Sequence, residues 1–310
     1  MVATVIITAA VVLGLVVAVS GPSADKGPGS VAVDASGVAI DPSAFATGAC
    51  MVFAPTTGNR HRTVFLDAGH GGIDPGGVGE TTTGKAIDEA TETLPVELDA
   101  MALLRAEGFS VVVSRTRAST VVRLSAADRS EGVLSLQGAH DDVAARDVCA
   151  NLAKADLLVG IYYDAGATSD DAGSLTAYDA DRSFSSANIK LANLLQRNVV
   201  ADLDKQGWSI PNDGVQPDTE LGSFVGDASD GGIAGAAASY DHLLVLGPAE
   251  SGFFSTPSTM PGAVIEPLYL TDPFEGSIAD SSHGQHVIAQ GIAAAVVDYF
   301  ASAKHTATTG

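Results

Sequence analysis

The sequence predicts a single α/β domain in which helices cover both faces of a twisted, mostly parallel β-sheet. Short apolar runs rich in β-branched residues alternate along the chain with longer stretches of helical periodicity. Glycines punctuate these runs, as at Gly69 and Gly108. The 310 residues, of which 46% are apolar and 17% charged, are also enough to build a full hydrophobic core.

Each element is predicted from its own pattern. Residues 63–67 (TVFLD) are β-branched and aromatic and run into a glycine-rich loop, which indicates a buried strand. Residues 95–106 carry apolar side chains at helical spacing and stop before Gly108, which indicates a helix. The same reasoning predicts strands at residues 109–114, 157–162, 174–178, 243–246 and 263–266, and helices at residues 142–154, 186–204 and 284–300.

The first 57 residues are expected to precede the domain. Residues 2–20 are apolar and uncharged and end in small side chains, which predicts a signal peptide or an uncleaved membrane anchor. Residues 21–57 are rich in Gly, Pro, Ser and Ala and predict a flexible linker. The domain is then expected at residues 58–302, with a disordered tail at 303–310. Such a leader predicts an extracytoplasmic protein, secreted or anchored through residues 2–20.

Two cysteines are present, Cys50 and Cys149. In an oxidising compartment an even pair indicates a disulfide, and the alternative is two buried thiols that act as small apolar side chains. A bridge would tie the region before the domain to the domain's interior.

The charge excludes one class of partner. The sequence holds 37 acidic and 16 basic residues, a formal net charge of −21. Such a field repels phosphate backbones, so no nucleic-acid partner is expected.

We expect the chain to be a monomer.

Two candidate functional side chains follow strands that should end at the same edge of the sheet. His70 lies directly beyond residues 63–67, between glycines that leave its imidazole open. Glu266 ends the strand at 263–266, immediately before Pro267. Sites of α/β sheets gather at the carboxyl ends of the strands, and a neutral imidazole is a common zinc ligand. The sequence therefore predicts a metal site at this edge.

These segments resemble a known enzyme family. Between residues 63 and 300 the chain shows, in order, FLDAGHGGIDPG, VVVSRT, ADLLVGIYYDA and PGAVIEPLYLTD. This series is similar to the zinc-dependent N-acetylmuramoyl-L-alanine amidases of the bacterial cell wall. The resemblance implies a Zn²⁺ enzyme of the cell envelope. Its substrate would be peptidoglycan or a muropeptide, and zinc-activated water would hydrolyse the amide between N-acetylmuramic acid and L-alanine.

The resemblance also implies roles for particular residues. His70 takes the place of a zinc-ligating histidine, and Glu266 that of the catalytic carboxylate, which accepts the proton of the attacking water and passes it to the leaving amine. The second ligand is a glutamate at the start of the following helix. Counting back from Gly108 favours Glu89, with Glu92 as the alternative.

One motif departs from the family pattern. Where the family carries a third histidine ligand, this chain has Tyr162, and strand alternation puts Asp164 on the same side if the strand continues. An oxygen from either could complete a three-ligand set. His242 could also approach the metal, but we expect it to face solvent at the start of a strand. The lost histidine leaves a second function open, that of a non-catalytic peptidoglycan-binding or regulatory pseudo-amidase.

Two other histidines, His283 and His286, are expected on the surface of the last helix.

Overall fold

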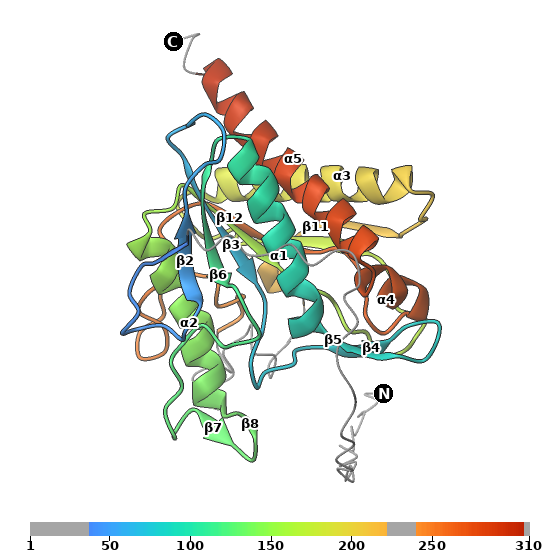
Figure 1. Cartoon of the computed structure of the whole chain (residues 1–310), viewed down its shortest axis with the longest axis horizontal. Coiled ribbons are helices and arrows are strands. Elements are labelled where there is room, and N and C mark those ends of the chain that lie inside the picture. The colour runs from blue at the N-terminus through green and yellow to red at the C-terminus, as the bar shows by residue number, and fades with distance from the viewer. Residues whose placement is uncertain (1–36, 222–239, 307–310) are drawn as a thin grey trace, which may run out of the picture. The chain divides into compact units, whose positions relative to one another are not determined.

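The computed structural model describes residues 37–221 and 240–306 (Figure 1). Residues 1–36, which include the expected leader and the first part of the expected linker, lie outside the described residues, as do residues 307–310. The described residues belong to one compact unit. This unit confirms the single α/β domain that the sequence predicts.

A mixed eight-stranded sheet forms the centre of the domain. The central strands β6, β3, β9 and β12 are parallel, whereas β1 and β2 on one side are antiparallel to their neighbours. On the other side β10 is antiparallel to β12 and parallel to β11. In spatial order the strands are β1 (Val38–Ala39), β2 (Ala49–Phe53), β6 (Ser110–Arg115), β3 (Thr63–Ala68), β9 (Leu157–Ile161), β12 (Gly262–Glu266), β10 (Ser174–Tyr178) and β11 (Asn212–Pro217).

Helices cover both faces of this sheet. One face packs against α1 (Glu89–Ala106), α3 (Ser185–Lys205) and α5 (Ser282–Thr306), which Figure 1 shows close together. The other face packs against α2 (Leu136–Leu152) and an apolar loop that contains residues 243–246. The remaining elements are β4 (Val78–Glu80), β5 (Ala86–Asp88), β7 (Arg129–Ser130), β8 (Val133–Leu134), α4 (Pro273–Ala279) and a 3₁₀ turn at Asp218–Glu220.

Strand alternation assigns side chains to the two layers of the core. On β9, Val159 and Ile161 pack toward α1, α3 and α5, whereas Leu158 packs toward α2. Tyr162, the next residue, also lies in the α2 layer. Both faces of the strand are therefore apolar, as expected for a parallel strand covered by helices.

Most predicted helices and strands are confirmed, although several begin or end at other residues than expected. Helix α1 begins at Glu89, six residues before the expected start, because the Asp88 side chain caps it by accepting a hydrogen bond from Thr91 N at 2.9 Å. Helix α5 continues to Thr306, so the disorder expected from residue 303 is wrong for residues 303–306.

The strand expected at residues 243–246 is wrong. These residues form a turn in which the amides of Leu246 and Gly247 both donate to the carbonyl oxygen of Leu243, at 2.9 and 2.8 Å. The run is apolar because it packs on the α2 face of the sheet, and burial alone does not distinguish a strand from a packed turn.

The linker expected at residues 21–57 is also wrong over its described part. Strand β2 pairs antiparallel with β6 and buries Ala49, Cys50 and Phe53. The short apolar run ACMVF supplies that buried surface, although Gly, Pro, Ser and Ala dominate its surroundings.

The expected disulfide is confirmed between Cys50 on β2 and Cys149 on α2, 99 residues apart. It joins the antiparallel edge of the sheet to the helix that covers it. Across residues 37–221 and 240–306, none of the helices combines the length and the apolar character that a membrane crossing requires.

Candidate active site

The loop that follows β3 holds His70 in a fixed position. His70 has a φ of 57°, in the left-handed region, and its side chain is buried. Two buried arginines bind the loop carbonyls. Arg115 donates to Gly69 O at 3.1 Å, and Arg146 donates to His70 O at 2.8 Å. These bonds satisfy backbone groups that the loop leaves without strand partners, and they stabilise its strained backbone.

Carboxylates contact both nitrogens of the His70 ring. Nδ1 lies 2.9 Å from Asp74 Oδ2, and Nε2 lies 3.0 Å from Glu89 Oε2. Burial alone would lower the pKa of His70, but the charges of Glu89 and Asp74 outweigh burial and raise the pKa well above its usual value. Sequence analysis missed Asp74, although its spacing of four residues from His70 was a usable signal.

Glu89 and Glu92 have different surroundings although both are buried on the first turns of α1. Glu89 Oε1 accepts a hydrogen bond from Tyr163 N at 2.9 Å, and Oε2 accepts one from Gly77 N at 2.9 Å. Glu92 instead accepts a hydrogen bond from Gln285 of α5 at 2.9 Å, and burial raises its pKa to about 7. The structure thus brings Glu89 to His70 and turns Glu92 toward α5.

The His70–Glu89 pair suits a metal ion in donor type and in arrangement. Zinc takes imidazole nitrogen and carboxylate oxygen, and a ligating histidine commonly gives its other ring nitrogen to a carboxylate, as His70 does to Asp74. Tetrahedral zinc with ligands at about 2.0–2.2 Å separates two donor atoms by about 3.4 Å. The observed 3.0 Å between Nε2 and Oε2 is close to that separation.

Tyr162 lies beside His70, but its hydroxyl contacts another carboxylate. The two rings meet edge to face with centroids 5.5 Å apart. The phenol donates to Asp67 Oδ2 at 3.2 Å, and Asp67 forms a buried ion pair with Arg146 at 2.5 Å. A ligand role for Tyr162 therefore requires its hydroxyl to leave Asp67.

Asp164 lies beyond the end of β9, the strand that was expected to continue to it. Strand β9 ends at Ile161, so the condition for Asp164 to share the side of Tyr162 through strand alternation is not met. Its backbone amide donates to Leu268 O at 3.1 Å. Its carboxylate lies near Tyr269, whose pKa is raised by burial and by that charge.

Glu266 ends β12 at the edge of the sheet where His70 lies. Ile161 of β9 pairs with Ala68 of β3 on one side and with Ile265 of β12 on the other. Glu266 therefore lies one residue beyond this row, two strands from β3, and it is half-buried. The predicted catalytic carboxylate and the predicted zinc ligands share one edge of the sheet.

Two hollows lie beside this edge. One, of about 370 Å³, is lined by the loop after His70, the start of α1 and Val133 of β8. The other, of about 330 Å³, is lined by β4, residues 166–169 and Thr271. Both are bordered by close sequence neighbours of His70, Glu89 or Asp164.

The structure confirms the expected positions of two other histidines and contradicts that of a third. His283 and His286 are exposed on α5, as expected. The solvent-facing position expected for His242 is wrong, because its side chain is 9% exposed and its Nδ1 lies 2.9 Å from Asp179 Oδ2. Asp179 follows β10, which runs antiparallel to β12, so His242 lies at the edge of the sheet opposite Glu266.

Metal-binding potential within the described chain is not confined to His70 and Glu89. Across residues 37–221 and 240–306, the one set of at least three His, Cys, Asp or Glu donors within 4.8 Å is Asp179, Asp218 and His242.

The fold and this site define a class of protein: an α/β protein with a buried histidine–glutamate pair whose donor atoms suit a metal ion and with a glutamate at a neighbouring strand end. The family model for N-acetylmuramoyl-L-alanine amidase matches residues 64–298, and the chain belongs to this family.

Solved structures agree on the fold. The CwlD amidase of Clostridioides difficile, solved in complex with the GerS lipoprotein, is 20% identical with a TM-score of 0.57, and the match covers 78% of this chain and 99% of that one. The catalytic domain of CwlV from Bacillus (Paenibacillus) polymyxa var. colistinus is 22% identical with a TM-score of 0.51, covering 77% and 98%. AmiC2 of Nostoc punctiforme is 20% identical with a TM-score of 0.52, covering 79% and 99%. No curated protein matches the chain.

Proposed function

We propose that the chain hydrolyses the amide bond between N-acetylmuramic acid and L-alanine in peptidoglycan, at the sheet edge that carries His70, Glu89 and Glu266. Family membership makes it an amidase of peptidoglycan. The observation that carries the assignment to this edge is the buried contact of 3.0 Å between His70 Nε2 and Glu89 Oε2.

His70 and Glu89 would hold a zinc ion. Bound there, zinc supplies Lewis-acid chemistry, since it polarises a carbonyl and makes hydroxide available at neutral pH. Asp74 orients the imidazole through Nδ1 and keeps the Nε2 lone pair directed at the metal position. The amides of Gly77 and Tyr163 orient the Glu89 carboxylate.

Glu266 would act as the general base and then as the general acid. It takes the proton of the attacking water and delivers it to the amine of L-alanine, which leaves as the amide bond breaks. Transfer by a positioned carboxylate typically contributes about 10²–10⁴-fold to the rate. Its half-buried place at the end of β12 lets it meet both solvent and substrate.

Tyr162 and Asp164 are proposed as sources of the third protein ligand. The Tyr162 ring contacts the His70 ring, and its hydroxyl would have to exchange Asp67 for the metal. The Asp164 carboxylate lies near Tyr269 and offers an oxygen donor. A phenolate oxygen demands that the metal lower a pKa that is ordinarily near 10.

A non-catalytic pseudo-amidase is not favoured, because the chain matches the family model and has both His70 and Glu89 beside each other and Glu266 at the same edge. We propose that the enzyme acts outside the cytoplasm as a monomer, with residues 2–20 as signal peptide or anchor. The Cys50–Cys149 disulfide supports an oxidising compartment.

The test is cleavage of a purified muropeptide, with the released stem peptide measured by chromatography. Wild type is expected to cleave, and a chelator should stop cleavage. Glu266→Gln should lower turnover by about 10²-fold or more while zinc content stays at the wild-type value. Normal turnover by that variant would refute the role of Glu266, and normal turnover in chelator would refute the metal.

A further inference from the structure

Two aspartates follow the carboxyl ends of neighbouring parallel strands at the edge of the sheet opposite the candidate active site. Strands β10 and β11 are parallel, with Tyr178 paired to Pro217. Asp179 and Asp218 are the next residues of the two strands, so both carboxylates come to one place. Because β10 is antiparallel to β12, this place lies at the edge away from Glu266.

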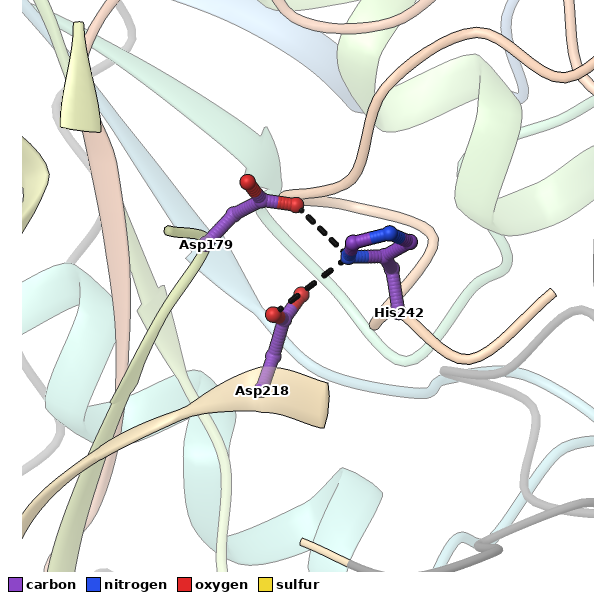
Figure 2. A group of neighbouring side chains, drawn as sticks. All are labelled: Asp179, Asp218 and His242. Carbon is purple, nitrogen blue, oxygen red and sulfur yellow. Dashed lines mark ion pairs between the residues drawn. The ribbon is translucent and has the colours of Figure 1, made fainter. Parts of the chain in front are cut away.

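His242 completes a buried group of three side chains at this place, as Figure 2 shows. Its Nδ1 lies 2.9 Å from Asp179 Oδ2 and 3.5 Å from Asp218 Oδ1. Both aspartate side chains are 0% exposed. A nitrogen and two oxygens from three separate segments therefore converge away from solvent.

Each carboxylate is anchored by one oxygen and directs the other into the group. Asp179 Oδ1 accepts hydrogen bonds from the amides of Asp181 and Arg182, at 2.7 and 3.0 Å. Asp218 Oδ2 accepts one from Leu243 N at 3.1 Å. Their other oxygens, Asp179 Oδ2 and Asp218 Oδ1, face the imidazole.

The three atoms that face one another in this group are buried and polar. His242 Nδ1 contacts Asp179 Oδ2 and Asp218 Oδ1 as ion pairs, and none of the three atoms makes a hydrogen bond of good geometry to the residues that the structure describes. Buried polar atoms in folded proteins are nearly always hydrogen-bonded. Three such atoms at one point indicate a ligand that takes nitrogen and oxygen donors together.

The charge and the distances favour a divalent cation. Two buried carboxylates carry a formal charge of −2, and a single proton on His242 would offset only half of it. A divalent ion would offset all of it. Donor atoms around tetrahedral zinc lie about 3.4 Å apart, and the two observed nitrogen–oxygen distances are 2.9 and 3.5 Å.

We propose that Asp179, Asp218 and His242 form a second metal site, distinct from the His70–Glu89 pair, for a divalent cation of the zinc type. The imidazole donor favours such an ion over magnesium or calcium, which prefer all-oxygen sites. Two carboxylates, Asp241 and Asp181, lie within 4 Å of Nε2 on the other side of the ring. When a cation takes Nδ1, the proton of the imidazole is on Nε2 and faces these two carboxylates. The bound ion would fasten the loop at His242 to the ends of β10 and β11.

The experiment titrates zinc alone into the full-length, disulfide-bonded protein after removal of metal, with bound zinc counted by equilibrium dialysis and elemental analysis. The double variant His70→Ala, Glu89→Gln removes the first site and should keep one zinc per chain. Adding His242→Gln should weaken that remaining binding by roughly tenfold or more. His286→Gln is the matched control, because it removes an exposed histidine that also faces an aspartate, Asp99, at 3.1 Å.

The proposal is overturned if the double variant binds no zinc, or if His242→Gln binds as tightly as His286→Gln. Should His242→Gln fail to fold, Asp218→Asn takes its place and should weaken binding in the same way. X-ray absorption of the zinc-loaded double variant gives an independent readout. One nitrogen and two protein oxygens are expected around zinc, and a shell of water oxygen alone would refute the site.

Discussion

Glu89 and Glu92 show how far single residues can be assigned from the sequence. They lie three residues apart on one helix, and counting from Gly108 favours Glu89 without excluding Glu92. The structure separates them by their neighbours. Glu89 meets the loop after β3 and the end of β9, whereas Glu92 lies one turn further along and meets α5. Counting along the sequence gives no such information, because α5 begins almost two hundred residues later.

The two glutamates make a matched pair of variants. Glu89→Gln should weaken zinc binding by about 10²-fold, because it removes the charged ligand that lies beside His70. Glu92→Gln should leave zinc affinity within about threefold of wild type, because its side chain contacts Gln285 instead. Zinc affinity is measured by competition with a chromophoric chelator, in a His242→Gln background that excludes the second site. Equal losses in both variants would contradict the assignment.

Tyr162 marks the limit of residue-level prediction. Its alignment with a ligand histidine came from the order of motifs, and its place beside the His70 ring is as expected. No sequence pattern indicates that the Tyr162 hydroxyl binds Asp67, because that carboxylate is held by Arg146, which lies 79 residues further along the chain on α2. Hydrogen-bond partners set by tertiary packing cannot be read from local spacing.

At the scale of elements, Arg146 links α2 to the loop after β3. It forms ion pairs with Asp67 at 2.5 Å and Asp142 at 2.8 Å, all three side chains being buried. Arg146→Met should therefore lower the free energy of unfolding by about 3–5 kcal/mol, because it leaves two buried carboxylates without their cationic partner. Urea unfolding followed by circular dichroism measures the loss.

The control for Arg146 is an exposed pair of the same type. Arg197 and Asp298 lie 2.9 Å apart, with side chains 63% and 48% exposed. Arg197→Met should cost less than about 1 kcal/mol, because solvent screens such pairs. If Arg146→Met cost no more than this control, the buried network would not stabilise the fold.

Strand β2 and the disulfide form the second link between elements. The sequence predicts the bridge from two cysteines, but it misses β2 because a five-residue apolar run is too short to stand out from a Gly- and Ser-rich stretch. The short hairpins β4–β5 and β7–β8 are missed for the same reason, since two or three residues carry no measurable periodicity.

Removal of the bridge by Cys50→Ser with Cys149→Ser should destabilise the domain. Loop-closure entropy for a loop of this length predicts a loss of about 4–5 kcal/mol. Thermal unfolding of the double variant and of the reduced wild type should show the same downward shift. A double variant as stable as the oxidised wild type would mean that β2 is held by its pairing with β6 alone.

At the scale of the whole molecule, the alternation of strands and helices was sufficient to predict the fold class and the edge that gathers His70 and Glu266. It did not predict that β10 runs against β12. The direction of a strand depends on the path of the connection that leads into it, and the sequence pattern does not specify that path. Helix α3 connects β10 to β11, and the two strands are parallel neighbours. This reversal places Asp179 and Asp218 at the edge opposite Glu266, and His242, which contacts both, therefore lies away from His70.

Acidic groups across the molecule predict a common dependence of stability on pH. Burial raises the pKa values of Glu92, Glu97 and Glu275 to about 7, from an ordinary value of 4.5. Below about pH 4.5 the folded and unfolded chains both hold these protons. Between pH 4.5 and 7 the unfolded chain releases them and the folded chain does not, so stability falls as pH rises through this window and levels off above it. Self-repulsion from the net charge of −21 acts in the same direction.

Glu97 gives the sharpest test of this dependence, because it is fully buried and accepts hydrogen bonds from Ala68 N and from the amide and hydroxyl of Ser114. Glu97→Gln keeps an acceptor oxygen and removes the titration. The drop in unfolding free energy between pH 5 and pH 8 should shrink by up to about 3 kcal/mol, since each pKa unit corresponds to about 1.4 kcal/mol. Glu131→Gln, at an exposed position, should leave the drop unchanged. Urea unfolding at the two pH values measures both variants, and an equal drop in wild type and Glu97→Gln would show that Glu97 ionises in the folded chain as readily as in the unfolded one.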